Sequence, residues 1–429
     1  MIKNSLIHVI NLLSILCSSW VALAHVEAAT GAELAAGAPM PKDGVKVATV
    51  ASQAAWVMGN DEVELAVTQL GAHMAPVKFY RASSAPVEPY YICPWHDETL
   101  ADAAPPVLRV LRGDFFCMPF GTNAASSNGE THPPHGEPSG GGWNLVGHGK
   151  TGRVTTLEIL FKPQVRPGTI TKRISLVDGQ NAIYSQETLS GFKGAMPLGH
   201  HAILAVPEKE GSLRVAASSF ALGMTCPVLF SDPRNREYQS MAIGKEFTDL
   251  RHVPLLWKEP AEADATVFPA RTGFTDMLAI CRKPVWGGEP AWITASVQQD
   301  GYLWFALKNP AVLPTTVFWI SNRGRQGPPW NGRNRCLGLE DVCGFFAEGI
   351  KASCEPNVLT RHGIPTALEL SPERPTVVNY IQGLVRIPAG FEMVRSAQFE
   401  PGKVTFVSIT GKQASAAVHW EFLTTGKLP

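Results

Sequence analysis

Short runs in which apolar and polar residues alternate recur along the chain from residue 47 onward, with turn residues between them. Such alternation is typical of β-strands that bury one face. Helical periodicity is scarce, and only residues 356–364 predict one short helix. Many strands without alternating helices favour a β-sandwich over βαβ units. The clearest predicted strands are residues 63–68, 153–161, 169–176, 182–189, 292–297, 302–307, 404–409 and 416–422.

The N-terminus has the three parts of a secretory signal: a positive charge, an apolar run and an Ala-Leu-Ala sequence at residues 22–24. We therefore expect a signal peptide over residues 1–24 and export to the periplasm or the extracellular space. A flexible leader rich in Ala, Gly and Pro is expected over residues 25–45, and one β-sandwich domain over residues 46–429. The rest of the sequence has no apolar stretch of about 18 residues, so we expect no membrane contact after signal cleavage.

The composition narrows the classes of function. The chain has 429 residues with 37 basic and 37 acidic side chains, so its formal net charge is zero. A nucleic-acid-binding surface would bring a basic excess, and we therefore expect no nucleic-acid partner. The 39 glycines, 34 prolines and 45% hydrophobic residues indicate a turn-rich globular protein with an ample core.

The cysteines give no metal-binding or redox motif. Cys17 lies in the expected signal peptide, and no Cys-x-x-Cys spacing occurs in the chain. A zinc ribbon and a thioredoxin motif are therefore excluded. The spacing leaves the disulfide pairing open, because Cys336, Cys343 and Cys354 can hold one bridge or be buried thiols.

Histidines and a carboxylate pair stand in segments bounded by Gly or Pro. His132 and His135 flank two prolines in the loop 123–142, and His200-His201 follows Met-Pro-Leu-Gly. Glu340 is followed by Asp341 after an apolar turn. Loops on a rigid framework are where sites are commonly built, so these clusters predict a functional site. A metal site is an alternative that the spacing permits without enforcing, with the candidate ligands His132, His135, His148 and His200.

The order of these segments resembles the galactose mutarotase-like (aldose 1-epimerase) superfamily. The resemblance implies an all-β fold, a large antiparallel β-supersandwich with few short helices. It also implies interconversion of the anomers of a free sugar or sugar derivative, with a small carbohydrate as partner and with neither a metal nor a cofactor. The matching segments are residues 63–75, 111–121, His135-Gly136 with Trp143, 198–201 and 337–340.

The resemblance also implies roles for individual residues. Glu340 would be the base that takes the proton from the C1 hydroxyl, and His201 the acid that protonates the ring oxygen from the opposite side of the sugar. His135 would bind the sugar, Arg112 would bind its hydroxyls or structure the loop, and Trp143 would offer an apolar face to its C–H groups.

A basic run near Glu340 adds one more candidate for substrate binding, Arg333. The run has four arginines and is either a solvated face of the protein or a surface that would suit an acidic sugar: Arg323, Arg325, Arg333 and Arg335.

Several departures from the family pattern leave alternatives open. His201 is followed by Ala-Ile where relatives carry Pro-Tyr-Phe, and Glu340 is followed by Asp341 where many carry proline. The family's mid-chain aspartate is not placed, with Asp264 and Asp276 as candidates. A non-catalytic carbohydrate-binding module on the same fold is therefore the alternative, and a polysaccharide lyase, which shares such sandwiches, is a further one.

Overall fold

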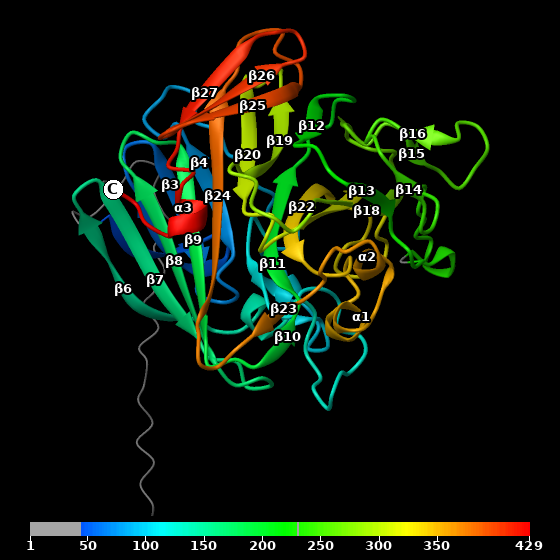
Figure 1. Ribbon diagram of the computed structural model, residues 1–429, viewed down its shortest axis with the longest axis horizontal. Coiled ribbons are helices and arrows are strands. Elements are labelled where there is room, and N and C mark those ends of the chain that lie inside the picture. The colour runs from blue at the N-terminus through cyan, green and yellow to red at the C-terminus, as the bar shows by residue number, and fades with distance from the viewer. Residues whose placement is uncertain (1–43, 230) are drawn as a thin grey trace, which may run out of the picture. The chain divides into compact units, whose positions relative to one another are not determined.

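Two antiparallel β-sheets face each other at the centre of the computed structural model, which describes residues 44–229 and 231–429 (Figure 1). All described residues fall in one compact unit. The predicted signal peptide and nearly all of the predicted leader lie outside the described residues. In the part of the chain that is described, no helix is long and apolar enough to cross a membrane.

The larger sheet has nine strands, and every pairing within it is antiparallel. Its order is β17 (Val267–Phe268), β12 (Leu213–Ala217), β19 (Ala291–Val297), β20 (Tyr302–Lys308), β24 (Thr376–Arg386), β9 (Ala182–Ser190), β8 (Thr169–Val177), β7 (Val154–Phe161) and β6 (Asn144–Thr151).

The other large sheet has seven strands, again all antiparallel. Its order is β14 (Glu246–Phe247), β13 (Leu222–Thr225), β18 (Phe274–Cys281), β21 (Thr315–Asn322), β22 (Arg335–Cys343), β11 (Leu198–Ala205) and β5 (Phe116–Cys117).

Smaller sheets and short helices complete the fold. The four-stranded sheet has β1 (Val45–Val50), β2 (Gln53–Gly59), β3 (Val63–Thr68) and β4 (Met74–Phe79). Two two-stranded sheets pair β10 (Gly194–Met196) with β23 (Leu368–Leu370) and β15 (Val253–Pro254) with β16 (Glu262–Ala263). The three-stranded sheet has β25 (Val394–Glu400), β26 (Lys403–Ser408) and β27 (Gln413–Ala417). The helices are α1 (Ile350–Cys354), α2 (Val358–Arg361) and α3 (Phe422–Thr425), with 3-10 turns at Pro106–Arg109, Glu137–Ser139 and Pro233–Asn235.

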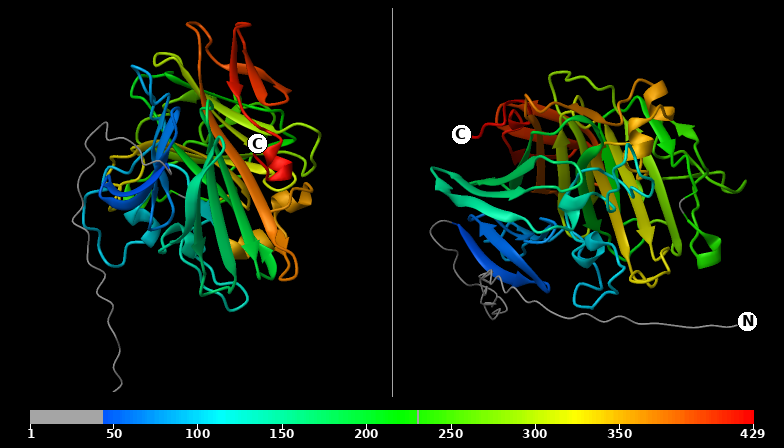
Figure 2. Two further views of the ribbon diagram at one scale, coloured as in Figure 1. Left: turned by 90° about the vertical axis from the view of Figure 1, so that its left-hand side faces the viewer. Right: turned by 90° about the horizontal axis from the view of Figure 1, so that it is seen from below.

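Alternation along each strand sorts the side chains into separate cores. On the seven-stranded sheet, the inner face is the one turned toward the nine-stranded sheet, where Phe318 and Leu339 join the main core. The outer face carries Val317 and Val342, which pack under the loops and helices of a second core. The outer face of the nine-stranded sheet packs under the three-stranded sheet and α3 (Figure 2).

Most strands expected from alternation are present, and the short helix expected over residues 356–364 is α2. The predicted strand over residues 416–422 is wrong, because pairing ends at Ala417 and Phe422 begins α3. Val418 and Phe422 are both buried against the nine-stranded sheet. Ala416, Val418, Trp420 and Phe422 are all apolar, so the alternation continues past the residue at which pairing ends and does not mark the end of the strand.

Candidate active site

His201 and Glu340 lie side by side on the outer face of the seven-stranded sheet. They occupy directly opposed positions of β11 and β22, and opposed residues of an antiparallel pair share one face of the sheet. His201 Nε2 lies 3.2 Å from Glu340 Oε1. Their side chains are 6% and 2% exposed. The structure thus brings the two predicted catalytic groups into contact, whereas the resemblance implies opposite sides of a sugar ring.

Gly338 makes room for the Glu340 carboxylate. The two residues lie on the same face of β22, since side chains of a strand alternate. A Cβ atom at position 338 would lie 2.6 Å from Glu340 Oε1 and 3.0 Å from the Cβ atom of Trp319. A glycine at this position therefore lets the carboxylate lie over the strand.

Stacked rings hold the imidazole of His201. Phe115 stacks on it with ring centroids 4.6 Å apart, and His73 stacks on the other side of Phe115 at 3.9 Å. The backbone N–H of His201 donates to the carbonyl oxygen of Phe115 at 2.9 Å. These contacts fix the orientation of the imidazole plane and its position above the sheet.

His135 reaches the same place from the Gly- and Pro-rich loop. Its ring centroid lies 4.8 Å from that of His201, and its Nδ1 lies 3.5 Å from Cys117 Sγ. His135 has a φ of 60° and Gly136 one of 79°. Only glycine fits at position 136, because a Cβ there would lie 2.0 Å from the carbonyl oxygen of Met118. The loop can therefore pass close to the sheet and deliver the imidazole.

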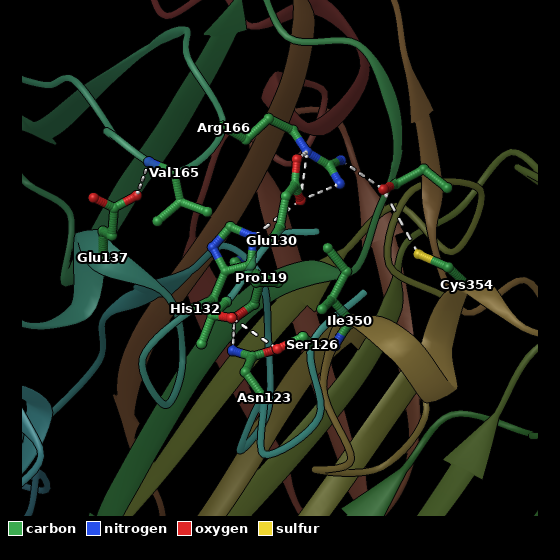
Figure 3. Close-up of polar contacts among 12 residues, drawn as sticks. Pro119, Asn123, Ser126, Glu130, His132, Glu137, Val165, Arg166, Ile350 and Cys354 are labelled. Atoms are coloured by element: carbon green, nitrogen blue, oxygen red, sulfur yellow. Dashed lines mark hydrogen bonds and ion pairs between the residues drawn. The ribbon is translucent and has the colours of Figure 1, made fainter. Parts of the chain in front are cut away.

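Polar contacts anchor this loop at its two halves (Figure 3). The Asn123 amide donates to the carbonyl oxygen of Pro119 at 3.1 Å and accepts from the N–H of Ile350 at 2.9 Å.

The second half of the loop is held through Glu130. Its carboxylate forms an ion pair with Arg166 at 2.7 Å and contacts His132 Nε2 at 3.1 Å (Figure 3). His132 therefore contributes to loop structure.

A cavity of about 370 Å³ lies over His201 and Glu340. One wall is aromatic, because Trp319 and Trp330 meet edge to face at 5.7 Å. Most of the remaining lining is apolar. The lining residues are Pro105, Val107, Leu108, Leu111, Thr122, Pro134, His135, His201, Met277, Trp319, Arg325, Trp330, Glu340 and Ala347.

Arg112 and Trp143 do not line this cavity. The Arg112 guanidinium is buried and donates to the carbonyl oxygens of Val110, Val50 and Ala51 at 3.2, 3.1 and 3.0 Å. Trp143 is a core residue whose indole N–H donates to a backbone carbonyl. These contacts give both side chains a structural setting in place of the predicted sugar contact.

Arg333 also lies outside the cavity lining. Its guanidinium pairs with Glu98 and donates to the carbonyl oxygen of Pro329 at 2.8 Å. The arginine of the basic run that lines the cavity is Arg325, whose Nη1 lies 3.2 Å from Glu237 Oε2.

Burial sets the protonation of the site. It raises the pKa of Glu340 well above its ordinary value and lowers that of His201 well below. It also lowers the pKa of His135 to about 4. Burial thus favours the neutral form of all three groups, with the proton of the pair on Glu340 and both imidazoles uncharged. This is the reverse of the resting state that the resemblance implies.

The four histidines of the metal alternative do not come together. His148 lies on β6, whereas His200 lies on β11 between the two large sheets. Within the described residues, no group of three or more His, Cys, Asp or Glu side chains could hold a metal ion. The seven cysteines of that part of the chain are all free thiols, Cys336, Cys343 and Cys354 among them.

Asp264 and Asp276, the candidates for the mid-chain aspartate, line a separate cavity of about 510 Å³. Asp276 accepts from the N–H groups of Ser240 and Met241 at 2.7 and 2.8 Å, which gives it a structural role in that wall.

Sequence reasoning missed the aromatic wall. Trp319 alternates with Phe318 on β21, but this strand is buried on both faces, so its pattern does not distinguish the site face from the core. Trp330 follows Pro328-Pro329 in a loop, where no periodicity applies. Phe115 belongs to residues 111–121, which resemble the family, but the resemblance implies no role for this residue.

Solved structures establish the fold. A galactose mutarotase-like protein from Clostridium acetobutylicum is 11% identical with a TM-score of 0.54, covering 81% of this chain and 100% of that one. A candidate aldose 1-epimerase from Klebsiella pneumoniae is 10% identical with a TM-score of 0.53, covering 79% and 83%. A candidate mutarotase from Salmonella typhimurium is 11% identical with a TM-score of 0.51, covering 81% and 97%. No protein-family model and no curated protein sequence matches the chain. The chain has the galactose mutarotase-like fold, as its sequence predicted.

Proposed function

We propose that this chain is an exported aldose 1-epimerase-like enzyme that interconverts the anomers of a free sugar or sugar derivative. The proposal rests on one observation above all, the contact of His201 Nε2 with Glu340 Oε1 at 3.2 Å inside a cavity of about 370 Å³. The fold, which the chain shares with structures described as mutarotase-like, supports it. Export rests on the signal pattern of residues 1–24.

An adjacent acid–base pair suits ring opening. The C1 hydroxyl must lose a proton while the ring oxygen gains one, and both oxygens are bound to the same carbon. With the shared proton on Glu340, the carboxyl group protonates the ring oxygen and His201 Nε2 takes the hydroxyl proton. The C1–O5 bond breaks, and C1 becomes an aldehyde carbon.

Closure restores the pair. After rotation about C1–C2, the C5 hydroxyl attacks the other face of the aldehyde. Glu340 takes the proton of that hydroxyl, and His201 returns its proton to the C1 oxygen. Neither residue has to exchange a proton with water during the cycle, so a buried pair is adequate.

The cavity wall fits a sugar. Trp319 and Trp330 offer apolar surface to the C–H faces of a pyranose, and such aromatic contacts add binding energy beyond the buried area. His135 lies within the lining as a neutral group that can accept or donate a hydrogen bond.

The test is anomer exchange measured by NMR on a panel of hexoses, pentoses and uronic acids. We expect a rate above that of buffer for at least one sugar, reduced at least about 100-fold in Glu340→Gln and His201→Asn. A matched pair outside the cavity serves as the control. The side chains of His252 and Glu262 are exposed, and His252 Nδ1 lies 2.8 Å from Glu262 Oε2. His252→Asn and Glu262→Gln should leave the rate unchanged.

Other results would redirect the proposal. Saturable line broadening of one sugar without exchange would make this chain a carbohydrate-binding module on the same fold. Exchange that survives in both Glu340→Gln and His201→Asn, or silence for every sugar, would contradict the proposed enzyme.

A further inference from the structure

A second histidine and a second carboxylate lie directly behind the candidate pair, on the other face of the same two strands. His200 is opposed to Asp341 across β11 and β22, one position along from His201 and Glu340. Because side chains alternate along a strand, these two side chains point to the inner face, between the two large sheets. All four side chains are buried.

Both ring nitrogens of His200 contact a carboxylate oxygen. Nδ1 lies 2.9 Å from Asp114 Oδ2, and Nε2 lies 3.1 Å from Glu187 Oε2. The other carboxylate oxygen of Glu187 lies 3.3 Å from Lys172 Nζ. Glu187 and Lys172 belong to β9 and β8 of the nine-stranded sheet, so the imidazole of His200 connects the two sheets.

Asp341 is held in the same way. Its carboxylate lies 2.5 Å from Lys308 Nζ and accepts from the hydroxyls of Tyr380 at 2.8 Å and Thr316 at 2.5 Å. Lys308 and Tyr380 belong to β20 and β24 of the nine-stranded sheet. The ring of Tyr380 also stacks on His200 with centroids 4.2 Å apart, which joins the two halves into one network.

The network is confined to this level of the sheet interface. Among the described residues, the ion pairs in which both side chains are at most 6% exposed are those of this network and the His201–Glu340 pair. The inner-face positions next to it are apolar: Ala202 and Leu204 on β11, and Leu337 and Leu339 on β22.

Stability alone does not account for this placement. Buried ion pairs lose solvation, and apolar residues of similar volume are often equally stabilising. Directional contacts do fix orientation, and a catalytic group has to be held to within about 0.5 Å. Burial is the largest single effect on the pKa of His200 and lowers it, but the carboxylates of Glu187 and Asp114 together raise this pKa to about 9, so the imidazole of His200 is charged.

We propose that His200, Asp341 and their partners on the nine-stranded sheet are positioning residues that set the contact between His201 and Glu340. They act through the backbone of β11 and β22 and do not touch the sugar. The catalytic part of this inference rests on the proposed function; the geometric part does not.

The test uses the double variant Lys308→Met with Asp341→Leu, which removes one charge of each sign and leaves no unpaired ion. Side-chain ¹⁵N NMR of His201, assigned by the signal lost in His201→Asn, reports the contact at Nε2. We expect these resonances to shift, and kcat for anomer exchange to fall at least tenfold with KM within twofold.

Leu337→Ala is the control, because Leu337 lies on the same inner face of β22 without a charge. It should lower the melting temperature and leave the His201 resonances in place. Unchanged His201 resonances in the folded double variant, or an equal shift in Leu337→Ala, would overturn the inference.

The resonances of His201 also decide the inference if the double variant does not fold or if the protein exchanges no sugar. If the double variant does not fold, Tyr380→Phe removes only the hydroxyl bonded to Asp341; a shift of His201 then supports the inference, and its absence overturns it. If the wild-type protein exchanges no sugar, the proposed function fails while the resonances still decide the positioning role.

Discussion

His201 and Glu340 are opposed residues of two adjacent strands, and their side chains meet at 3.2 Å beneath an apolar cavity. The contact brings an acid and a base close enough together to reach two oxygens that are bound to one carbon. It also couples their protonation, because the pair holds one shared proton. The chemistry proposed for the site follows from this single relationship.

The first prediction concerns pH. Burial raises the pKa of Glu340 and lowers that of His201. The pair therefore gains a second proton only well below the ordinary pKa of a histidine, and loses its one proton only well above that of a glutamate. Anomer exchange, measured as a rate against pH, should therefore show no titration step near the ordinary pKa of a histidine, about 6.5, or near that of a glutamate, about 4.3. An acid limb with its midpoint near pH 6.5 would show an exposed, independent histidine instead.

The second prediction concerns Gly338. Gly338→Ala places a methyl group within 2.6 Å of Glu340 Oε1 and should displace the carboxylate. Misplacement by about 1 Å costs on the order of 100-fold in rate. We expect kcat to fall by that order while circular dichroism and melting temperature change little.

Gly147→Ala is the matched control, since no atom lies within 4 Å of the Cβ that it would add on β6. Equal rates for Gly338→Ala and the wild-type protein would mean that the position of Glu340 is unimportant.

The sequence predicted the architecture better than the site. Strands with one polar face, such as β7 and β8, alternate clearly, and the fully buried β19 and β20 are also predicted; β21 mixes polar and apolar residues on both of its buried faces and shows no alternation. The resemblance pointed to His201, Glu340 and His135, which the fold gathers in one cavity.

Arg112 illustrates what a motif cannot convey. Its position in a family-like segment gave no sign that three backbone carbonyls surround its guanidinium. The contact between Glu340 and His201 also depends on strand register, which follows from pairing across the sheet and not from local sequence.

The third prediction concerns the aromatic wall. Trp330 contacts Trp319 and Trp95 edge to face and lines the cavity. Trp330→Ala should weaken sugar binding roughly threefold to tenfold, or about 0.5–1.5 kcal/mol, because an aromatic contact is lost. Titration followed by NMR measures this, with KM rising and kcat changing less. Trp420→Ala, near the C-terminal sheet, is the control and should leave binding unchanged.

The fourth prediction separates a structural role of Arg112 from sugar binding. Burial lowers the pKa of its guanidinium to about 10, and its N–H groups donate to three carbonyl oxygens, two of them at the end of β1 and in the turn that follows it. Arg112→Met leaves these carbonyls without donors and should lower the free energy of unfolding by about 3 kcal/mol.

Affinity for the sugar should stay the same in the folded Arg112→Met protein, because the guanidinium lies outside the cavity lining. Arg153→Met is the matched control, since the Arg153 guanidinium donates to a backbone carbonyl at the surface and its loss should change stability little. Chemical denaturation and NMR titration measure the two quantities separately. A variant of wild-type stability with weakened sugar binding would return Arg112 to the substrate-binding role that the sequence resemblance implied.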